Sequence, residues 1–373
     1  MRILAASLLF FVSGPVSAAG FAPAEDLFGV DFAVLKDQAA RTPDPKAGPA
    51  GGAQAQRPVR SLSGLFRSQQ VETGYLPDSF PKTAAGWVQS LNAAVDDYRI
   101  GDEFGKKPVT AGGLGGTSPV FQRAAKATAA YGGGTAFYLG KFNGHHMVAT
   151  NHHVAEGGCQ GPARFPLLGK SYSCERVYAD WKEVDLDLFS IIVPEADEAL
   201  LAPLGRNFSF DASIYTGQEL LTVGFGIAGN PRRVMMANQD SDCKVFSDTG
   251  DFRLVADPDQ YNPADYSAWS FVNGCDVSHG DSGSAFVDRN TGDVLGLIWT
   301  GKIPKSPKVL SSAYLAEMLR TKSPEIWTEL AFCVPAPKIK ERIQEELQAS
   351  PGNNDRNRTL TAIVQTPVTL SAR

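Results

Sequence analysis

The sequence lacks a surplus of positive charge. Its 373 residues include 35 Lys and Arg against 40 Asp and Glu, with a net charge of −5 and a pI of about 5.6. Proteins that bind nucleic acid neutralise phosphate groups with clustered Lys and Arg. A comparable basic patch for an anionic membrane surface is also missing. The composition therefore argues against nucleic acid and membranes as partners.

Long hydrophobic runs are scarce. Residues 3–12 are nearly all apolar, follow the basic Arg2 and precede small residues at 16–18. This pattern is typical of a secretory signal peptide, and the run is shorter than the roughly 20 apolar residues that span a bilayer, the feature a membrane anchor would need. We expect residues 1–18 to be removed and the protein to be secreted or periplasmic.

Cysteine is also sparse, with five in the chain. In the oxidising compartment that export implies, cysteines close in sequence are expected to pair. We predict disulfides between Cys159 and Cys174 and between Cys243 and Cys275, each worth about 2–4 kcal/mol. The odd number leaves one sulfur over, for which Cys333 is the candidate. Buried free thiols are the alternative.

The chain changes character near residue 119. Residues 19–119 are interpreted as an N-terminal extension, with a prosegment as one hypothesis, and 41–60 has the Pro-, Ala-, Gly- and Gln-rich composition of a disordered linker. Apolar residues at helical spacing between 87 and 98 predict one helix within it. The 37 glycines and 24 prolines of the whole chain exclude an all-helical bundle and favour short strands joined by turns.

Residues 120–302 have the pattern of short β-strands. Segments 135–142 and 145–150 flank Asn143 and Gly144, which accept positive φ and predict a two-residue hairpin. Further strands are predicted over 186–193, 219–225, 252–255, 284–288 and 293–299. Residues 303–350 have helical periodicity, and 351–373 are interpreted as a tail.

The first indication of chemistry is the sequence Gly-Asp-Ser-Gly-Ser at residues 280–284. A serine hydroxyl needs a base to take its proton and N–H groups aimed at the oxyanion that forms. Flanking glycines allow a turn tight enough to present both, and the N–H groups of Gly280 and Ser282 would then form the oxyanion hole. An ordinary polar turn is the alternative.

Two other segments supply a base and a carboxylate. His152 and His153 follow a predicted strand, while Asp185 and Asp187 stand at the start of another. Because the aspartates are two residues apart, strand alternation places them on one side and does not choose between them. A nucleophile, a base and an orienting carboxylate together indicate hydrolytic catalysis.

These segments, in the order histidine, aspartate, serine, resemble those of the trypsin-like (chymotrypsin-fold) serine proteases over about residues 121–302. The motif Thr-Asn-His-His-Val resembles the family's histidine motif and implies that His153 is the base and His152 is structural. The resemblance implies Asp187 as the orienting carboxylate and Ser282 as the nucleophile. The Gly-x-Ser-Gly-Ser form resembles the bacterial glutamyl-endopeptidase branch.

The same resemblance implies a specificity pocket and a fold. Asp276 would lie at the pocket floor, where a carboxylate favours Arg or Lys at the cleaved bond, and Trp299, Thr300 and Gly301 would lie along the substrate. His279 would lie at the pocket rim. The implied fold is all-β, with two antiparallel six-stranded Greek-key barrels, about 121–204 and 205–302, and the active site in the cleft between them. A partly disordered N-terminal extension and C-terminal helices would flank them.

The function predicted is a secreted serine endopeptidase that acts through an acyl-enzyme. We expect a monomer with a peptide or protein substrate and no cofactor. The resemblance implies that Asp281 would capture a freed N-terminal amine, as in trypsin-style activation, so trimming near Lys107 or Arg123 is a further hypothesis. A catalytically silent binding protein of the same fold is one alternative. A metal-binding protein is another, but the histidine doublets at 145–146 and 152–153 would lie about 23 Å apart along a strand.

Overall fold

The structure is a computed structural model that describes residues 99–228, 230, 233–257, 266–301 and 306–366. The predicted signal peptide, the linker-like segment and the predicted helix ending at Tyr98 lie outside the described residues. Among the residues described, no helix is long and apolar enough to cross a membrane.

Six antiparallel strands close the first barrel, in the order β2-β3-β4-β7-β6-β5. They are β2 Thr128–Tyr131, β3 Gly134–Phe142, β4 His145–Thr150, β5 Pro162–Phe165, β6 Lys170–Trp181 and β7 Leu186–Ile191. The predicted hairpin is confirmed, because Asn143 and Gly144 both have positive φ, 48° and 87°, and Phe142 pairs with His145. The turn places β3 and β4 side by side, as the pair of turn residues indicated.

Aromatic side chains pack inside this barrel. Tyr131 from β2 stacks on Phe189 from β7 with ring centroids 4.5 Å apart, and both are almost fully buried. Helix α4, Pro119–Ala127, leads into the barrel; Ser118 caps it by accepting a hydrogen bond from the Phe121 N–H, and proline occupies its first turn. A short helix, α6 Glu195–Leu201, follows β7.

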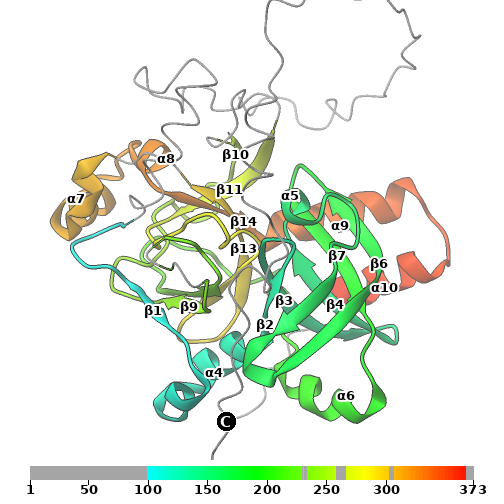
Figure 1. Ribbon diagram of the computed structural model, residues 1–373. Coiled ribbons are helices and arrows are strands. Elements are labelled where there is room, and N and C mark those ends of the chain that lie inside the picture. Colours follow the sequence, from blue (N-terminus) through cyan, green and yellow to red (C-terminus); the bar gives the residue numbers. More distant parts are fainter. Residues whose placement is uncertain (1–98, 229, 231–232, 258–265, 302–305, 367–373) are drawn as a thin grey trace, which may run out of the picture.

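The second half of the domain is an eight-stranded antiparallel sheet in the order β1-β9-β8-β12-β13-β14-β11-β10 (Figure 1). Its strands are β1 Lys106–Pro108, β8 Leu220–Gly224, β9 Met236–Asn238, β10 Arg253–Ala256, β11 Ser267–Asn273, β12 Ala285–Asp288, β13 Val294–Gly301 and β14 Ala331–Pro335. The predicted fold class is confirmed as mostly β, with one closed six-stranded barrel and a second antiparallel sheet.

The second sheet differs from the prediction in its membership. Strand β1 belongs to the predicted extension, yet it pairs with β9, and β14 comes from the predicted helical region but lies between β13 and β11. Each strand is short, with little periodicity of its own, so only its pairing partner identifies it. The fold therefore draws on chain from both sides of residues 120–302.

The remaining C-terminal elements are helices α7 Ser312–Thr321, α8 Ile326–Glu329, α9 Ala336–Ala349 and α10 Asp355–Gln365. Short 3₁₀ turns along the whole domain are Ala111–Gly116, Pro166–Leu168, Ala202–Leu204 and Pro307–Leu310. Helix α10 lies within the predicted tail. It buries Leu360 and Ile363 completely, and Asp355 at its first turn contacts Arg176 and Tyr178 of the first barrel. Burial of this apolar face makes the segment part of the fold.

Both predicted disulfides are confirmed. Cys159 bonds to Cys174 and Cys243 bonds to Cys275. Cys333 is a buried free thiol on β14, and burial raises its pKa well above the usual value. A neutral thiol with no exposure has little reactivity, so Cys333 is a packing residue.

Candidate active site

His153 lies at the end of β4, where the strand turns into the one-turn helix α5, His152–Ala155. Its ring nitrogen Nδ1 is 2.8 Å from Oδ2 of Asp185, and its backbone N–H donates to Oδ1 of the same carboxylate at 3.1 Å. The imidazole is 35% exposed, whereas the Asp185 carboxylate is fully buried. An imidazole that donates its Nδ1–H to a carboxylate carries its lone pair on Nε2, the nitrogen that can then accept a proton.

Asp185 is held rigidly in the turn before β7. Its φ is 34°, its N–H donates to the Lys182 carbonyl at 2.9 Å, and its own carbonyl accepts from the Asn151 side chain at 2.8 Å. The hydroxyl of Tyr266 donates to Oδ1 at 2.6 Å. With the backbone and ring N–H groups of His153, Tyr266 makes three donors to this buried carboxylate. They satisfy its oxygens and fix the imidazole that it holds.

Asp187 is not the partner of His153, which corrects the prediction from sequence. Because Asp185 lies in a turn rather than in the strand, the alternation of side chains along β7 does not relate the two carboxylates. Asp187 is paired across the sheet with Thr150 and Asp180, and neither of its oxygens has a hydrogen-bond partner among the described residues. Burial, with a smaller contribution from the Asp180 charge, raises the pKa of Asp187 to about 8. It is a protonated core carboxyl at neutral pH.

Ser282 lies on a loop of the second sheet that packs against the first barrel. The Ser282 carbonyl accepts from the Thr135 N–H at 2.9 Å, and the Gly280 carbonyl accepts from the Thr135 hydroxyl at 2.7 Å. Gly280 and Gly283 have φ of 93° and 85°, and a side chain at Gly283 would overlap the Thr135 carbonyl. Glycine is needed at both positions for conformation and for space, because a Cβ at Gly280 would lie 2.6 Å from the Phe225 carbonyl oxygen.

The same contacts bring Ser282 to the helix that carries His153. A Cβ atom at Gly134 would lie 2.9 Å both from the Ser282 carbonyl oxygen and from Cγ2 of Val154, the residue after His153. A Cβ at Gly283 would lie 3.2 Å from the N atom of Asn151, at the start of α5. The predicted nucleophile and the His153–Asp185 pair therefore meet at one junction between the two halves.

The loop also presents two free N–H groups. Within the described part of the chain, the N–H groups of Gly280 and Ser282 donate no hydrogen bond, whereas their neighbours do. Asp281 donates to Ser278 at 3.0 Å and Gly283 donates to Ile298 at 3.0 Å. These two unbonded N–H groups flank Asp281, and such a pair of donors can bind an oxyanion.

Comparison with known proteins agrees with this geometry. Residues 134–297 match the family of trypsin-like peptidase domains, a span that contains His153, Asp185 and Ser282. The chain carries a trypsin-like peptidase domain. No curated protein matches the sequence.

Among solved structures, the peptidase domain is similar to the protease Rv3671c of M. tuberculosis. An inactive mutant form is 18% identical with a TM-score of 0.42, over 66% of this chain and 98% of that one. The active form is 17% identical with a TM-score of 0.40, over 66% of this chain and 89% of that one.

Asp276 of the peptidase domain does not face a substrate pocket. Its carboxylate is fully buried and accepts the backbone N–H groups of Ile100 at 2.6 Å and Gly105 at 2.8 Å. Burial is the main cause that raises its pKa, to about 7. This placement corrects the prediction of a pocket floor, because both oxygens are already used by chain that the sequence analysis assigned to the extension.

The other predicted pocket residues lie on β13 of the peptidase domain. The Trp299 indole donates to the Ser270 hydroxyl at 2.8 Å, and the Thr300 hydroxyl donates to Asp257 at 2.9 Å. Gly301 ends the strand and is buried against Ala331. Both named side chains are buried and bonded internally, so they shape the strand rather than reach toward a substrate.

Tyr266 is a site residue that sequence reasoning missed. It belongs to the second half of the peptidase domain, yet its hydroxyl bonds to Asp185 and its ring lies edge-on to His153, with centroids 6.5 Å apart. No motif surrounds it, and its partner is 81 residues away. Only the folded arrangement reveals it.

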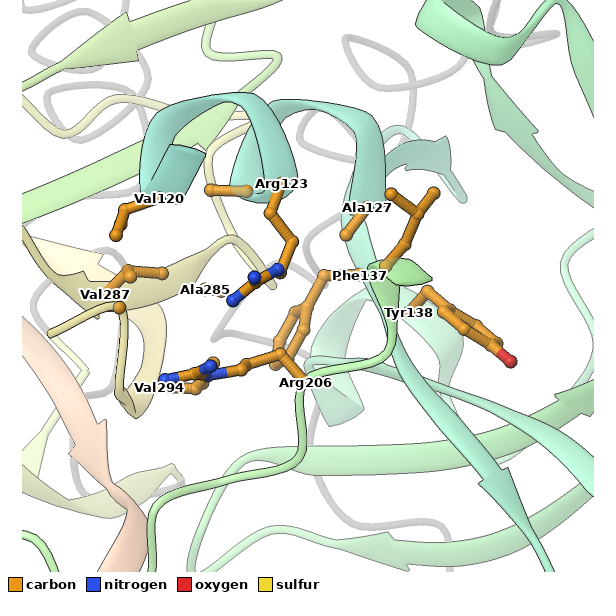
Figure 2. A pocket seen from close by; sticks show the side chains of 12 residues that line it. Val120, Arg123, Ala127, Phe137, Tyr138, Arg206, Ala285, Val287 and Val294 are labelled. Atoms are coloured by element: carbon orange, nitrogen blue, oxygen red, sulfur yellow. The ribbon is translucent and has the colours of Figure 1, made fainter. Parts of the chain in front are cut away.

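A hollow elsewhere in the domain does not belong to this site. Figure 2 shows it between α4 and the two halves, with Arg123 and Arg206 pointing into an otherwise apolar lining. Its volume of about 30 Å³ suits a single water molecule. Arg206 is paired with Asp293 at 3.5 Å.

The remaining histidines have separate partners. His145 contacts Asp355 at 3.2 Å, His146 bonds to the Tyr138 hydroxyl at 2.8 Å, and His152 contacts Asp180. His279, the predicted rim residue, accepts the Ile227 N–H on its carbonyl at 2.8 Å. No group of three or more metal-ligating side chains gathers anywhere in the part of the chain that is described.

Proposed function

We propose that this protein is an exported serine endopeptidase whose catalytic residues are Ser282, His153 and Asp185. The observation that supports it most directly is the 2.8 Å contact between His153 and Asp185, at the junction that also holds the Ser282 loop with its unbonded Gly280 and Ser282 N–H groups. A buried carboxylate that orients an imidazole next to a serine is the arrangement that makes a hydroxyl nucleophilic.

In the first step, Ser282 Oγ attacks the carbonyl carbon of the substrate while Nε2 of His153 takes the hydroxyl proton. The N–H groups of Gly280 and Ser282 would bind the oxyanion of the tetrahedral intermediate. Asp185 stabilises the imidazolium that forms. The C–N bond then breaks, and His153 donates its proton to the leaving amine.

The second step releases the acyl group from Ser282. Water loses a proton to His153 and adds to the ester carbonyl, and the same N–H groups bind the second oxyanion. Collapse of this intermediate returns the proton to Ser282 Oγ and frees a carboxylic acid. The products are the two halves of the cleaved peptide, and the protein returns to its starting state.

Export and a peptide substrate are parts of the same proposal. The two disulfides fit an oxidising compartment, since such bonds are rare in cytosolic proteins. A peptide or protein is the substrate class that a trypsin-like peptidase domain implies.

The test compares Ser282→Ala with Ser284→Ala, a control two residues away. The Ser284 hydroxyl is buried and has no hydrogen-bond partner among the described residues, so its removal should cost little. Ser282→Ala should lower kcat for a fluorogenic peptide by about 10⁶-fold, and a fluorophosphonate probe should label the parent and Ser284→Ala but not Ser282→Ala. A folded Ser282→Ala protein that cleaves peptides at the parent rate contradicts the proposal.

A further inference from the structure

A buried ion pair lies directly beside Ser282. The Lys106 ammonium group contacts the carboxylate of Asp281, the residue before Ser282, and the two side chains are only 2% and 3% exposed. Lys106 Nζ also donates to the Ser278 hydroxyl at 3.3 Å. A pair sealed this far from water needs both partners, because either one alone would be an uncompensated buried charge.

The Asp281 carboxylate holds the backbone of the catalytic loop. Oδ2 accepts the Ser278 N–H at 2.9 Å, and Oδ1 accepts the Gly226 N–H at 3.1 Å. Asp281 also lies between Gly280 and Ser282, whose N–H groups form the proposed oxyanion hole. If this side chain turned out toward solvent, the Ser278 and Gly226 N–H groups that anchor the loop would lose their acceptor.

Gly226 allows these charged and polar groups to converge. A side chain at Gly226 would overlap the Asp281 carboxylate, the Lys106 ammonium and the Ser278 hydroxyl at once. The three groups therefore meet against one bare Cα atom, with no room for a larger residue. The Lys106 ammonium group therefore lies in a specific buried site, and the contact is not one between surface side chains.

Lys106 reaches this site from chain that precedes the matched peptidase domain. It begins β1, which pairs with β9 at the edge of the second sheet (Figure 1). The Asp276 carboxylate accepts the N–H groups of Ile100 and Gly105, and this fastens the preceding residues to the same sheet. Two independent attachments, a strand pairing and a buried carboxylate, thus hold Lys106 in place.

We infer that Lys106 is a positioning residue for catalysis: its ammonium group holds Asp281, and through it the oxyanion hole, so that the domain is active without cleavage of the chain. This inference rests on the proposed function. It replaces the expectation that trimming near Lys107 or Arg123 supplies a new amine, because a lysine side chain already contacts Asp281. Such a cut would instead separate Lys106 from the rest of the domain.

The first test compares Lys106→Met with Lys107→Met. The first change keeps the length of the side chain and removes the charge, and the second removes an exposed charge from the same strand. We expect Lys106→Met to lower kcat for a peptide substrate by about 10²–10³-fold, the loss expected when oxyanion-hole donors are misplaced, with a smaller change in KM. Lys107→Met should match the parent. A folded Lys106→Met protein with parental kcat overturns the inference.

The double variant Lys106→Met with Asp281→Asn keeps the test decisive if Lys106→Met alone does not fold, because it leaves no buried charge. Since Lys106 acts through Asp281, the double variant should lose no more kcat than Asp281→Asn alone. Parental kcat in the folded double variant overturns the inference. So does a loss equal to the product of the two single losses, since the two residues would then act independently.

The second test measures the intact mass of the chain that a fluorophosphonate probe labels. We expect labelled chains to run unbroken from before Lys106 through Ser282. Labelling confined to chains cut between these two residues overturns the inference. If the probe labels no form of the parent, the proposed function fails; if it labels the parent and Lys106→Met equally, only the role of Lys106 fails.

Discussion

At the scale of single residues, two carboxylates two positions apart have opposite environments. Asp185 accepts three hydrogen bonds, one of them from the His153 ring, whereas Asp187 has none among the described residues. The three donors fix the Asp185 carboxylate so that it can orient an imidazole, whereas burial without donors raises the pKa of Asp187. The difference arises from one turn residue with positive φ, not from the identity of the side chains.

The paired substitutions Asp185→Asn and Asp187→Asn separate these roles. In Asp185→Asn the carboxamide favours the wrong tautomer of His153, so kcat should fall by about 10⁴-fold, the loss that follows from the same change in a Ser-His-Asp triad. Asp187→Asn should keep kcat within a few-fold of the parent. The measurement is kcat for a fluorogenic peptide, and an equal loss in both variants would show that the geometry assigns the wrong carboxylate.

Asp187 also predicts a pH dependence of stability. Because its pKa is raised to about 8 by burial, the folded state keeps the proton while the unfolded state releases it near the ordinary aspartate pKa of 3.8. The stabilisation is complete below pH 3.8 and is lost as pH rises through 8, with a slope of up to about 1.4 kcal/mol per pH unit in between. Asp187→Asn should remove this slope. Urea unfolding of both proteins at pH 5, 6, 7 and 8 tests it, and parallel curves would contradict it.

At the scale of elements, the segment before α4 is part of the sheet. Strand β1 pairs with β9, and Asp276 accepts two backbone N–H groups from residues just before that strand. The sequence of this segment has no β periodicity and reads as a loose linker. Its structure comes from donors and acceptors supplied by distant strands, which no local pattern encodes.

Asp276→Asn tests whether this carboxylate fastens the segment or selects a substrate. The amide offers one acceptor oxygen for two N–H groups, so the free energy of unfolding should fall by about 1–3 kcal/mol. The preference for the residue at the cleaved bond should not change, as a peptide library would show. Loss of a preference for Arg or Lys, with no loss of stability, would restore the pocket-floor role.

At the scale of the whole molecule, the site exists only where the two halves meet. The first barrel supplies His153 and Asp185, while the second sheet supplies Ser282 and Tyr266. Thr135 of the first barrel donates to the Ser282 carbonyl, and Trp269 of the second sheet donates its N–H to the Glu183 carbonyl at 3.0 Å. These contacts across the junction set the geometry on which the proposed catalysis depends.

Tyr266→Phe measures one contact across this junction. The change removes a hydroxyl that donates to the buried Asp185 carboxylate and keeps the ring. Because His153 is then held less firmly, the transition state should lose about 1 kcal/mol of stabilisation. This corresponds to a decrease in kcat of about fivefold with little change in KM. A change in KM alone would indicate that Tyr266 contacts the substrate and does not support Asp185.

The sequence by itself determined the features that depend on neighbours along the chain. The Asn143 hairpin, the two disulfides between nearby cysteines and the mostly β class followed from local geometry and spacing, and the glycine-flanked Ser282 was visible as a motif. Only the tertiary structure decided between Asp185 and Asp187, placed Lys106 against Asp281 and brought Tyr266 to the site. The physical reason is that each of these contacts joins residues tens to hundreds of positions apart, and whether a buried charge finds its partner depends on packing in three dimensions.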